Sequence, residues 1–142
     1  MARKTSGKKV LSRGRRTMSP ASGLDNIRRL IMTLLHSVTN VHVMHLQSKS
    51  FSEHMALGAY YTAVDKHVDS LVEAYQGHND LVMDYPMQND YKGGMTPVEY
   101  MKYVRGEVVS RRKSFPGSEL QNIIDTIIEL IDSTLYKLRF LH

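Results

Sequence analysis

The chain has 142 residues, a formal net charge of +5 and no cysteine. This length fits one domain with a core of its own, and the lack of cysteine excludes both a disulfide framework and a thiolate-bound metal. No run approaches the roughly 20 apolar residues that a membrane-spanning helix needs, so we expect no membrane partner.

The first 23 residues form a basic N-terminal arm. They contain seven basic residues and no acidic one, whereas the rest of the chain has 12 basic and 14 acidic residues. Glycine and serine are frequent and no helical period is present, so we expect an extended or disordered segment. We predict that its cations contact the phosphates of double-stranded DNA without sequence preference; the alternative is an acidic protein surface. These cations are Arg3, Lys4, Lys8, Lys9, Arg13, Arg15 and Arg16.

Residues 24–142 are predicted to form a bundle of amphipathic helices. Apolar residues recur at three- and four-residue steps from Leu24 to about Leu46, which predicts the first helix, with Ser22 or Asp25 as its cap. The second helix is predicted from about residue 51 to residue 75, after a cap at Ser50 or Ser52, with Gly77 as its stop signal.

The second half of the chain contains a long connection and two further helices. Residues 76–94 are rich in glycine, proline and asparagine and predict an irregular crossover. The sequence Thr96-Pro97-Val98-Glu99 is typical of a helix start, and that helix should end near residues 111–114. The fourth helix is predicted from Glu119 to about Phe140. One long connection between two short ones predicts an all-α, ferritin-like four-helix bundle.

Four side chains are the main candidate metal ligands: His42, His54, Asp69 and Glu73. They are separated by twelve, fifteen and four residues. At about 100° per residue, His54 and the two carboxylates lie within an arc of about 100° on the second helix. Imidazole and carboxylate groups suit iron, with zinc or manganese as alternatives.

Two further residues could join this set. Asp65 lies one turn before Asp69 and could be a ligand or a hydrogen-bond acceptor for one, and His45 lies three residues after His42, on the same side of the first helix. The alternative interpretation is that Asp65, Asp69 and Glu73 form the solvated face of the second helix.

The segment from His42 to Glu73 resembles the iron-site segment of the Dps family, small ferritin-like proteins that protect DNA in starved bacteria. Its members share the spacing of two histidines, an aspartate and a glutamate found here, and Thr96-Pro97 and the closing residues 136–141 are also similar. The resemblance covers residues 24–141. Family members usually carry tryptophan after the first histidine, whereas this chain has Val43; an alternative register matches His45-Leu46 to that pair.

The resemblance implies a function for these residues. Two histidines of one subunit, His54 with either His42 or His45, would face Asp69 and Glu73 of a two-fold-related subunit. The implied activity is that of a ferroxidase, which oxidises Fe(II) with peroxide or dioxygen, in a twelve-subunit shell. Such a protein is expected in the cytoplasm, at the nucleoid.

A second resemblance favours a different function. Residues 48–58 and 73–77 are similar to small, uncharacterised ferritin-like proteins encoded by bacteriophages. The alternative hypothesis is therefore a non-enzymatic structural or packaging protein of a virion, whose arm contacts DNA or neighbouring subunits.

Overall fold

The structure is a computed structural model that describes residues 20–86 and 90–142, with side chains from residue 22 onward. Within those residues the chain is all-helical and has no strand, which confirms the predicted fold class at this level. Its elements are α1 (Pro20–Gln47), α2 (Phe51–Asn79), α3 (Pro97–Arg111), the short 3-10 helix η1 (Arg112–Ser114) and α4 (Ser118–Phe140). The seven basic residues of the predicted arm lie outside the described residues.

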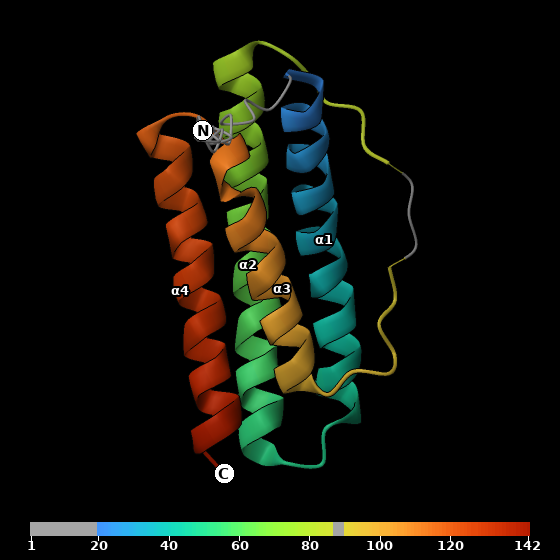
Figure 1. Cartoon of the computed structure of the whole chain (residues 1–142). Coiled ribbons are helices and arrows are strands. Elements are labelled where there is room, and N and C mark those ends of the chain that lie inside the picture. The colour runs from blue at the N-terminus through green and yellow to red at the C-terminus, as the bar shows by residue number, and fades with distance from the viewer. Residues whose placement is uncertain (1–19, 87–89) are drawn as a thin grey trace, which may run out of the picture.

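The four long helices lie side by side, and neighbouring helices run antiparallel (Figure 1). α1 packs against α2 and α3, and α4 packs against the same two helices. α1 and α4 therefore occupy one diagonal of the bundle, and α2 and α3 the other. Since α2 ends and α3 begins at opposite ends of the bundle, the connection between them has to return the chain along its whole length (Figure 1).

The boundaries of the first two helices differ in part from the prediction. α1 begins at Pro20 rather than near Leu24, because proline is well suited to a first helical turn. Asp25 therefore lies inside the helix, where it pairs with Arg29 at 2.7 Å. The cap of α2 at Ser50 is confirmed, but the predicted stop at Gly77 is wrong.

α2 continues through Gly77 to Asn79 and ends at a left-handed aspartate. Asp80 has φ 50°, and its backbone N–H donates to the carbonyl of Gln76. A short polar side chain makes this conformation accessible without glycine. In an isolated sequence, glycine is the stronger stop signal, which is why the end was placed too early.

The predicted start signal of α3 is confirmed, and α4 begins within one residue of the predicted position. Thr96 and Glu99 form a reciprocal capping box with Pro97 in the first turn. Gly117 precedes α4 with φ 90°, a conformation that favours glycine. These local signals fix where both helices begin.

The core is apolar, with a few uncharged polar groups that bond to one another. The hydroxyl groups of Ser37 and Tyr60 lie 2.9 Å apart, and Asn40 Nδ2 donates to Tyr100 Oη at 3.0 Å. Burial raises the pKa of both tyrosines well above the ordinary value. Among the described residues no histidine or carboxylate is buried in the core, so a metal site on this chain has to face outward.

Two amide side chains tie the crossover to the bundle. Gln76 Oε1 accepts hydrogen bonds from Met83 N at 2.9 Å and Tyr85 Oη at 3.1 Å. At the other end, Asn40 accepts from Lys92 N at 3.1 Å and donates to the carbonyl of Asp90 at 2.9 Å.

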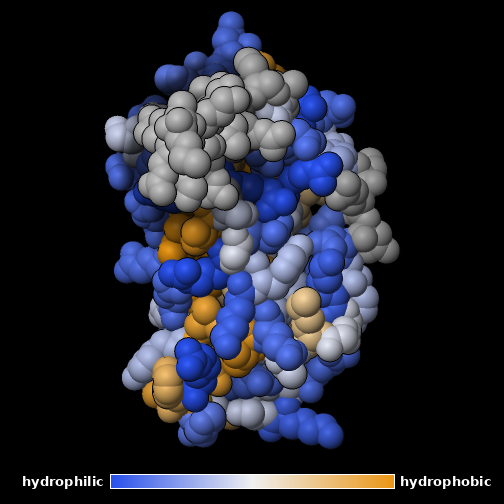
Figure 2. Space-filling model, in the orientation of Figure 1, coloured by the Kyte–Doolittle hydropathy of each residue, from blue (hydrophilic) through white to orange (hydrophobic). Residues whose placement is uncertain are grey.

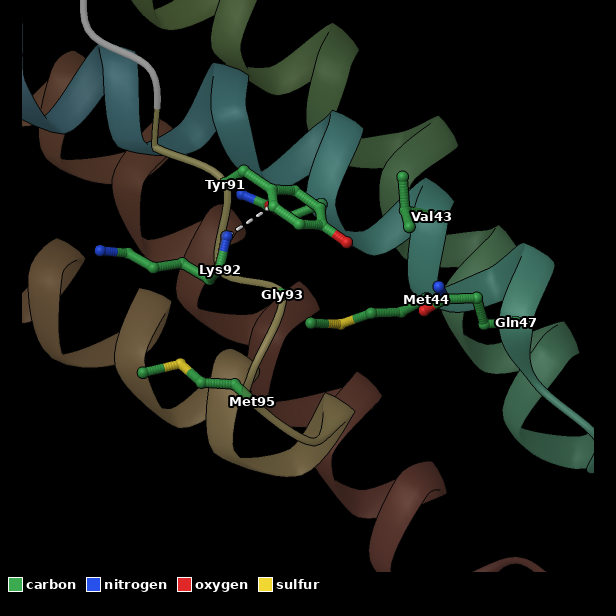
Figure 3. A pocket seen from close by; sticks show the side chains of 8 residues that line it. Val43, Met44, Gln47, Tyr91, Lys92, Gly93 and Met95 are labelled. Carbon is green, nitrogen blue, oxygen red and sulfur yellow. Dashed lines mark hydrogen bonds between the residues drawn. The ribbon is translucent and has the colours of Figure 1, made fainter.

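Beside Asn40, the crossover passes across α1 near Met44, through Tyr91, Lys92 and Gly93 (Figure 3). The space enclosed there is about 20 Å³, which is enough for about one water molecule. It is too small to be a ligand site.

On the face shown in Figure 2, most of the coloured surface is hydrophilic, and apolar side chains gather in a band on the side of α4. Across residues 20–86 and 90–142, no helix has both the length and the apolar character of a membrane span.

Candidate metal centre

Two imidazoles meet where α1 and α2 are joined. His45 lies in the last turn of α1, His54 lies in the first turn of α2, and only a three-residue loop separates these helices. The rings stack with centroids 3.6 Å apart and an interplanar angle of 22°. His45 Nδ1 donates to the carbonyl of His54 at 2.7 Å, and His54 Nδ1 donates to the carbonyl of His45 at 3.0 Å. We call this reciprocal arrangement the His45–His54 clasp.

The clasp determines which ring nitrogen is left for a ligand. A backbone carbonyl can only accept, so both Nδ1 atoms carry hydrogen. In a neutral imidazole the remaining Nε2 atom then has a free lone pair. Metal-binding histidines are commonly oriented by such a hydrogen bond from the other nitrogen to a carbonyl. Both rings therefore have the orienting hydrogen bond that metal-binding histidines commonly have.

Gly58 makes room for the clasp. A Cβ atom at this position would lie 3.1 Å from His45 Cε1 and 3.2 Å from His45 Nδ1, which is closer than ordinary van der Waals contact. The glycine lies inside α2, seven residues after Phe51, where it costs about 1 kcal/mol of helix stability relative to alanine. The position of the His45 ring gives a physical reason for its presence.

His42 lies beside the clasp rather than in it. Its ring stacks on Tyr61 at 4.3 Å and is 6.0 Å from His45, and Tyr61 meets the edge of His45 at 5.4 Å. The structure thus brings His45 directly against His54 and gives His42 an aromatic neighbour. Three imidazoles and one phenol cluster at this end of the α1–α2 hairpin.

The candidate carboxylates lie elsewhere on α2. Asp65, Asp69 and Glu73 are exposed, and within residues 22–86 and 90–142 none has a hydrogen bond or an ion pair. Asp69 follows His54 by fifteen residues, a distance of about 22 Å along a helix. In the described part of the chain, no three histidine, aspartate or glutamate side chains converge. One chain therefore does not gather the predicted ligands into a single centre.

A short basic segment, Arg111–Lys113, lies where α3 passes into η1, and its two arginines have a structural role. Arg111 pairs with Glu107 within α3. Arg112 donates two hydrogen bonds of 2.9 Å to the two carboxylate oxygens of Asp125 in α4. The bonds from Arg112 hold η1 against α4.

Gly58 and Tyr61 were not predicted as site residues. A usable signal was present for the histidine pair rather than for these two residues. Because the loop at residues 48–50 turns the chain back, residues at similar distances on either side of it must lie opposite each other. His45 and His54 satisfy this condition, whereas His42 is one turn further from the loop.

Over residues 20–86 and 90–142, the fold and the site define an antiparallel bundle of four long helices with an imidazole cluster at the end of its first hairpin. Residues 45–138 match a family of unknown function, DUF5856. Because this span is more than half of the chain, the protein belongs to that family. The match begins at His45 and includes all of α2 and α3. No curated protein and no solved structure matches the chain.

Proposed function

We propose that this chain is a ferritin-like protein of the Dps type. In this proposal it binds and oxidises Fe(II) between two copies, and its N-terminal arm contacts DNA. The observation that carries the proposal is the division of ligand types: two oriented imidazoles at one end of α2, and a row of unpartnered carboxylates further along it. Each half is incomplete alone and complements the other.

The topology supports the ferritin-like assignment. Bundles of this class have one long crossover, between the second and third helices, and here the longest connection joins α2 to α3. The absence of buried carboxylates among the described residues favours a site between subunits over one inside the bundle.

Two copies related by a two-fold axis can complete the site. If α2 of one copy runs antiparallel to α2 of the other, with the axis near Thr62, then His45 and His54 of each copy approach Asp69 and Glu73 of its partner. His42 and Asp65 lie close enough in sequence to be further ligands or hydrogen-bonding neighbours. The mixed nitrogen and oxygen donor set suits iron, and also zinc or manganese.

Fe(II) is the substrate in this proposal. The imidazoles bind the ferrous ion, and the carboxylates stabilise the additional positive charge of the ferric product. Two Fe(II) each give one electron to one hydrogen peroxide molecule, whose O–O bond breaks, and two protons from water complete two water molecules. The N–H···O=C bonds of the clasp keep both rings oriented while the charge of the ion changes.

The first test is metal content and native mass, followed by stopped-flow Fe(II) oxidation with peroxide. We expect a fixed number of iron ions for each pair of chains. The absorbance of the ferric product should develop at least about tenfold more slowly in His54→Ala and in His45→Gln than in the wild type. His67→Ala, elsewhere on α2, is the matched control. Full activity in both clasp variants would overturn the proposal and favour the structural or packaging protein.

The DNA part of the proposal has its own test. Neutralising up to seven phosphates predicts a slope of log affinity against log salt of about −6 at most. Replacing the arm's seven cations by glutamine should abolish binding of a random duplex in a gel-shift assay. The control is Lys102→Gln, a substitution on the exposed surface of α3. If this variant binds the duplex as well as the wild type does, the loss is specific to the arm.

A further inference from the structure

A hollow lies on the surface between α2 and the end of α4. It has a volume of about 370 Å³ and is lined by Ser52, Met55, Ala56, Ala59, Lys137 and Leu141. The two alanines leave it open, while Met55 and Leu141 are 55% and 47% exposed and form apolar walls. We call it the α2–α4 hollow.

Lys137 gives the α2–α4 hollow a positive edge. It lines the hollow, and no carboxylate of the described residues lies within ion-pair distance of it. Lys49, in the loop before α2, adds an exposed cation at the same end of the bundle. Apolar walls beside an unpaired ammonium group suit an apolar segment that carries carboxylates.

A segment of that chemistry follows the other end of α2. Residues 80–84 read Asp-Leu-Val-Met-Asp, and we call them the acidic tip. Val82 is 88% exposed and Leu81 is 37% exposed, whereas Met83 is buried. Asp80 and Asp84 are exposed, and neither forms an ion pair with the described residues.

Backbone N–H groups on both sides of Val82 hold the acidic tip in place by hydrogen bonds to Gln76. The N–H groups of Asp80 and Leu81 donate to the carbonyl of Gln76, and Met83 N donates to the side chain of Gln76 at 2.9 Å. Leu81 and Val82 are thus exposed on a defined turn. Binding through a preformed turn loses less conformational entropy than binding through an unstructured one.

We infer that the acidic tip of one copy docks in the α2–α4 hollow of a second copy. Leu81 and Val82 meet its apolar walls, and Asp80 or Asp84 pairs with Lys137. The tip cannot reach the hollow of its own chain, because α2 lies between them and its 29 residues span about 43 Å. The two surfaces match in both polarity and charge.

This contact is heterologous, because it joins two different surfaces of the chain. Head-to-tail contacts of this kind build rings or filaments, whereas a two-fold contact stops at two copies. Met55 and Ala59 lie within about 60° of Thr62 on the helix, so this contact uses part of the α2 face that the two-fold pair proposed above would cover, and at any one hollow the two contacts are alternatives. The contact of the tip with the hollow does not require iron, so it can be tested with metal removed by EDTA.

The test breaks each surface separately and then mixes the variants. Val82→Asp damages the acidic tip and Ala59→Glu damages the hollow; both positions are exposed, so the fold should be kept. By sedimentation, each variant should form a smaller species than the wild type. An equimolar mixture should recover a heteromeric complex, because the intact tip of one variant fits the intact hollow of the other.

Opposite results overturn the inference. Wild-type mass in either variant, no recovery on mixing, or a monomeric wild type would each exclude this contact. A charge exchange sharpens the result: Lys137→Glu and Asp84→Lys should each weaken association by about tenfold, and the double variant should recover most of it. If association follows this pattern but iron oxidation fails, the contact stands without the ferroxidase.

Discussion

The two hairpins of the bundle use their charged side chains in different ways. Between α3 and α4, Arg105 donates to both carboxylate oxygens of Asp132, at 2.6 and 3.0 Å, and Arg112 binds Asp125 in the same manner. The α1–α2 hairpin is joined instead by hydrogen bonds between groups other than ion pairs, through the His45–His54 clasp and a 2.9 Å bond between Ser37 and Tyr60.

This difference separates charges with a structural role from charges that are free to bind a ligand. The carboxylates of Asp125 and Asp132 are occupied by arginines. Asp65, Asp69 and Glu73 stand four residues apart on α2, and like charges at that spacing destabilise a helix by about 0.2–0.5 kcal/mol per pair. A row that costs stability in the single chain fits a surface that a cation or a partner neutralises.

The largest expected effect is a loss of iron oxidation without a loss of stability. Asp69→Asn combined with Glu73→Gln removes the unpaired carboxylates, so Fe(II) oxidation should slow by at least about tenfold, which equals 1.4 kcal/mol. The free energy of unfolding in urea should change by no more than about 0.5 kcal/mol. Stopped-flow absorbance and equilibrium denaturation measure the two quantities.

The matched control is Asp132→Asn on the other hairpin. It should leave iron oxidation at the wild-type rate, since its carboxylate is bound to Arg105 and lies on a different face. Equal losses of activity in both variants would mean that general acidity, rather than the α2 row, supports the reaction.

Much of the fold could be predicted from sequence because it depends on local signals. The capping box at Thr96, the serine cap at Ser50 and the long crossover all follow from short stretches whose chemistry acts within one turn. The end of α2 was misplaced because two local signals compete there, and only the tertiary bonds of Gln76 with the crossover favour the later one.

The candidate site was less predictable because it depends on contacts between helices. Spacing alone left His42 and His45 equivalent as partners of His54, and the pairing follows from how the hairpin packs. The space that Gly58 provides for the His45 ring, from thirteen residues further along the chain, is likewise a tertiary property. The carboxylate row was visible in sequence, but its lack of arginine partners was not.

The next largest effect compares glycines in the two hairpins. Gly58→Ala should destabilise the protein by about 1 kcal/mol, because the new methyl group displaces the His45 ring and this outweighs the gain in helix propensity. Gly106→Ala in α3 meets nothing within 4 Å and should stabilise by about 0.5–1 kcal/mol. Urea denaturation of both variants gives the two signs directly.

If Gly58→Ala stabilised the protein instead, the His45 ring would move aside at little cost in free energy, and the clasp would not fix the orientation of the two rings. Histidine ring signals in NMR spectra provide a second measurement, since displacement of His45 should broaden or shift the Nδ1–H resonances of both clasp residues and leave that of His67 unchanged.

A smaller effect is expected from breaking the α3–α4 ion pair. Arg105→Gln should lower the free energy of unfolding by about 0.5–1 kcal/mol, the range for a well-formed surface pair. High salt should reduce the difference from the wild type, because the pair is partly exposed. A loss that is unchanged in 1 M salt would indicate lost packing of the arginine stem rather than a lost charge interaction.

The smallest effect is the pH dependence of that same pair. The hydrogen bond from Arg105 lowers the pKa of Asp132 below its ordinary value of 3.8. A depressed pKa contributes stability that is present above the unfolded value and disappears as the pH falls through the folded value. The stability difference between the wild type and Asp132→Asn should therefore be largest above about pH 5 and shrink toward pH 3. In an Arg105→Gln background the cause of the depression is gone, so the difference should vary much less with pH; an equally steep dependence there would place its origin outside the ion pair.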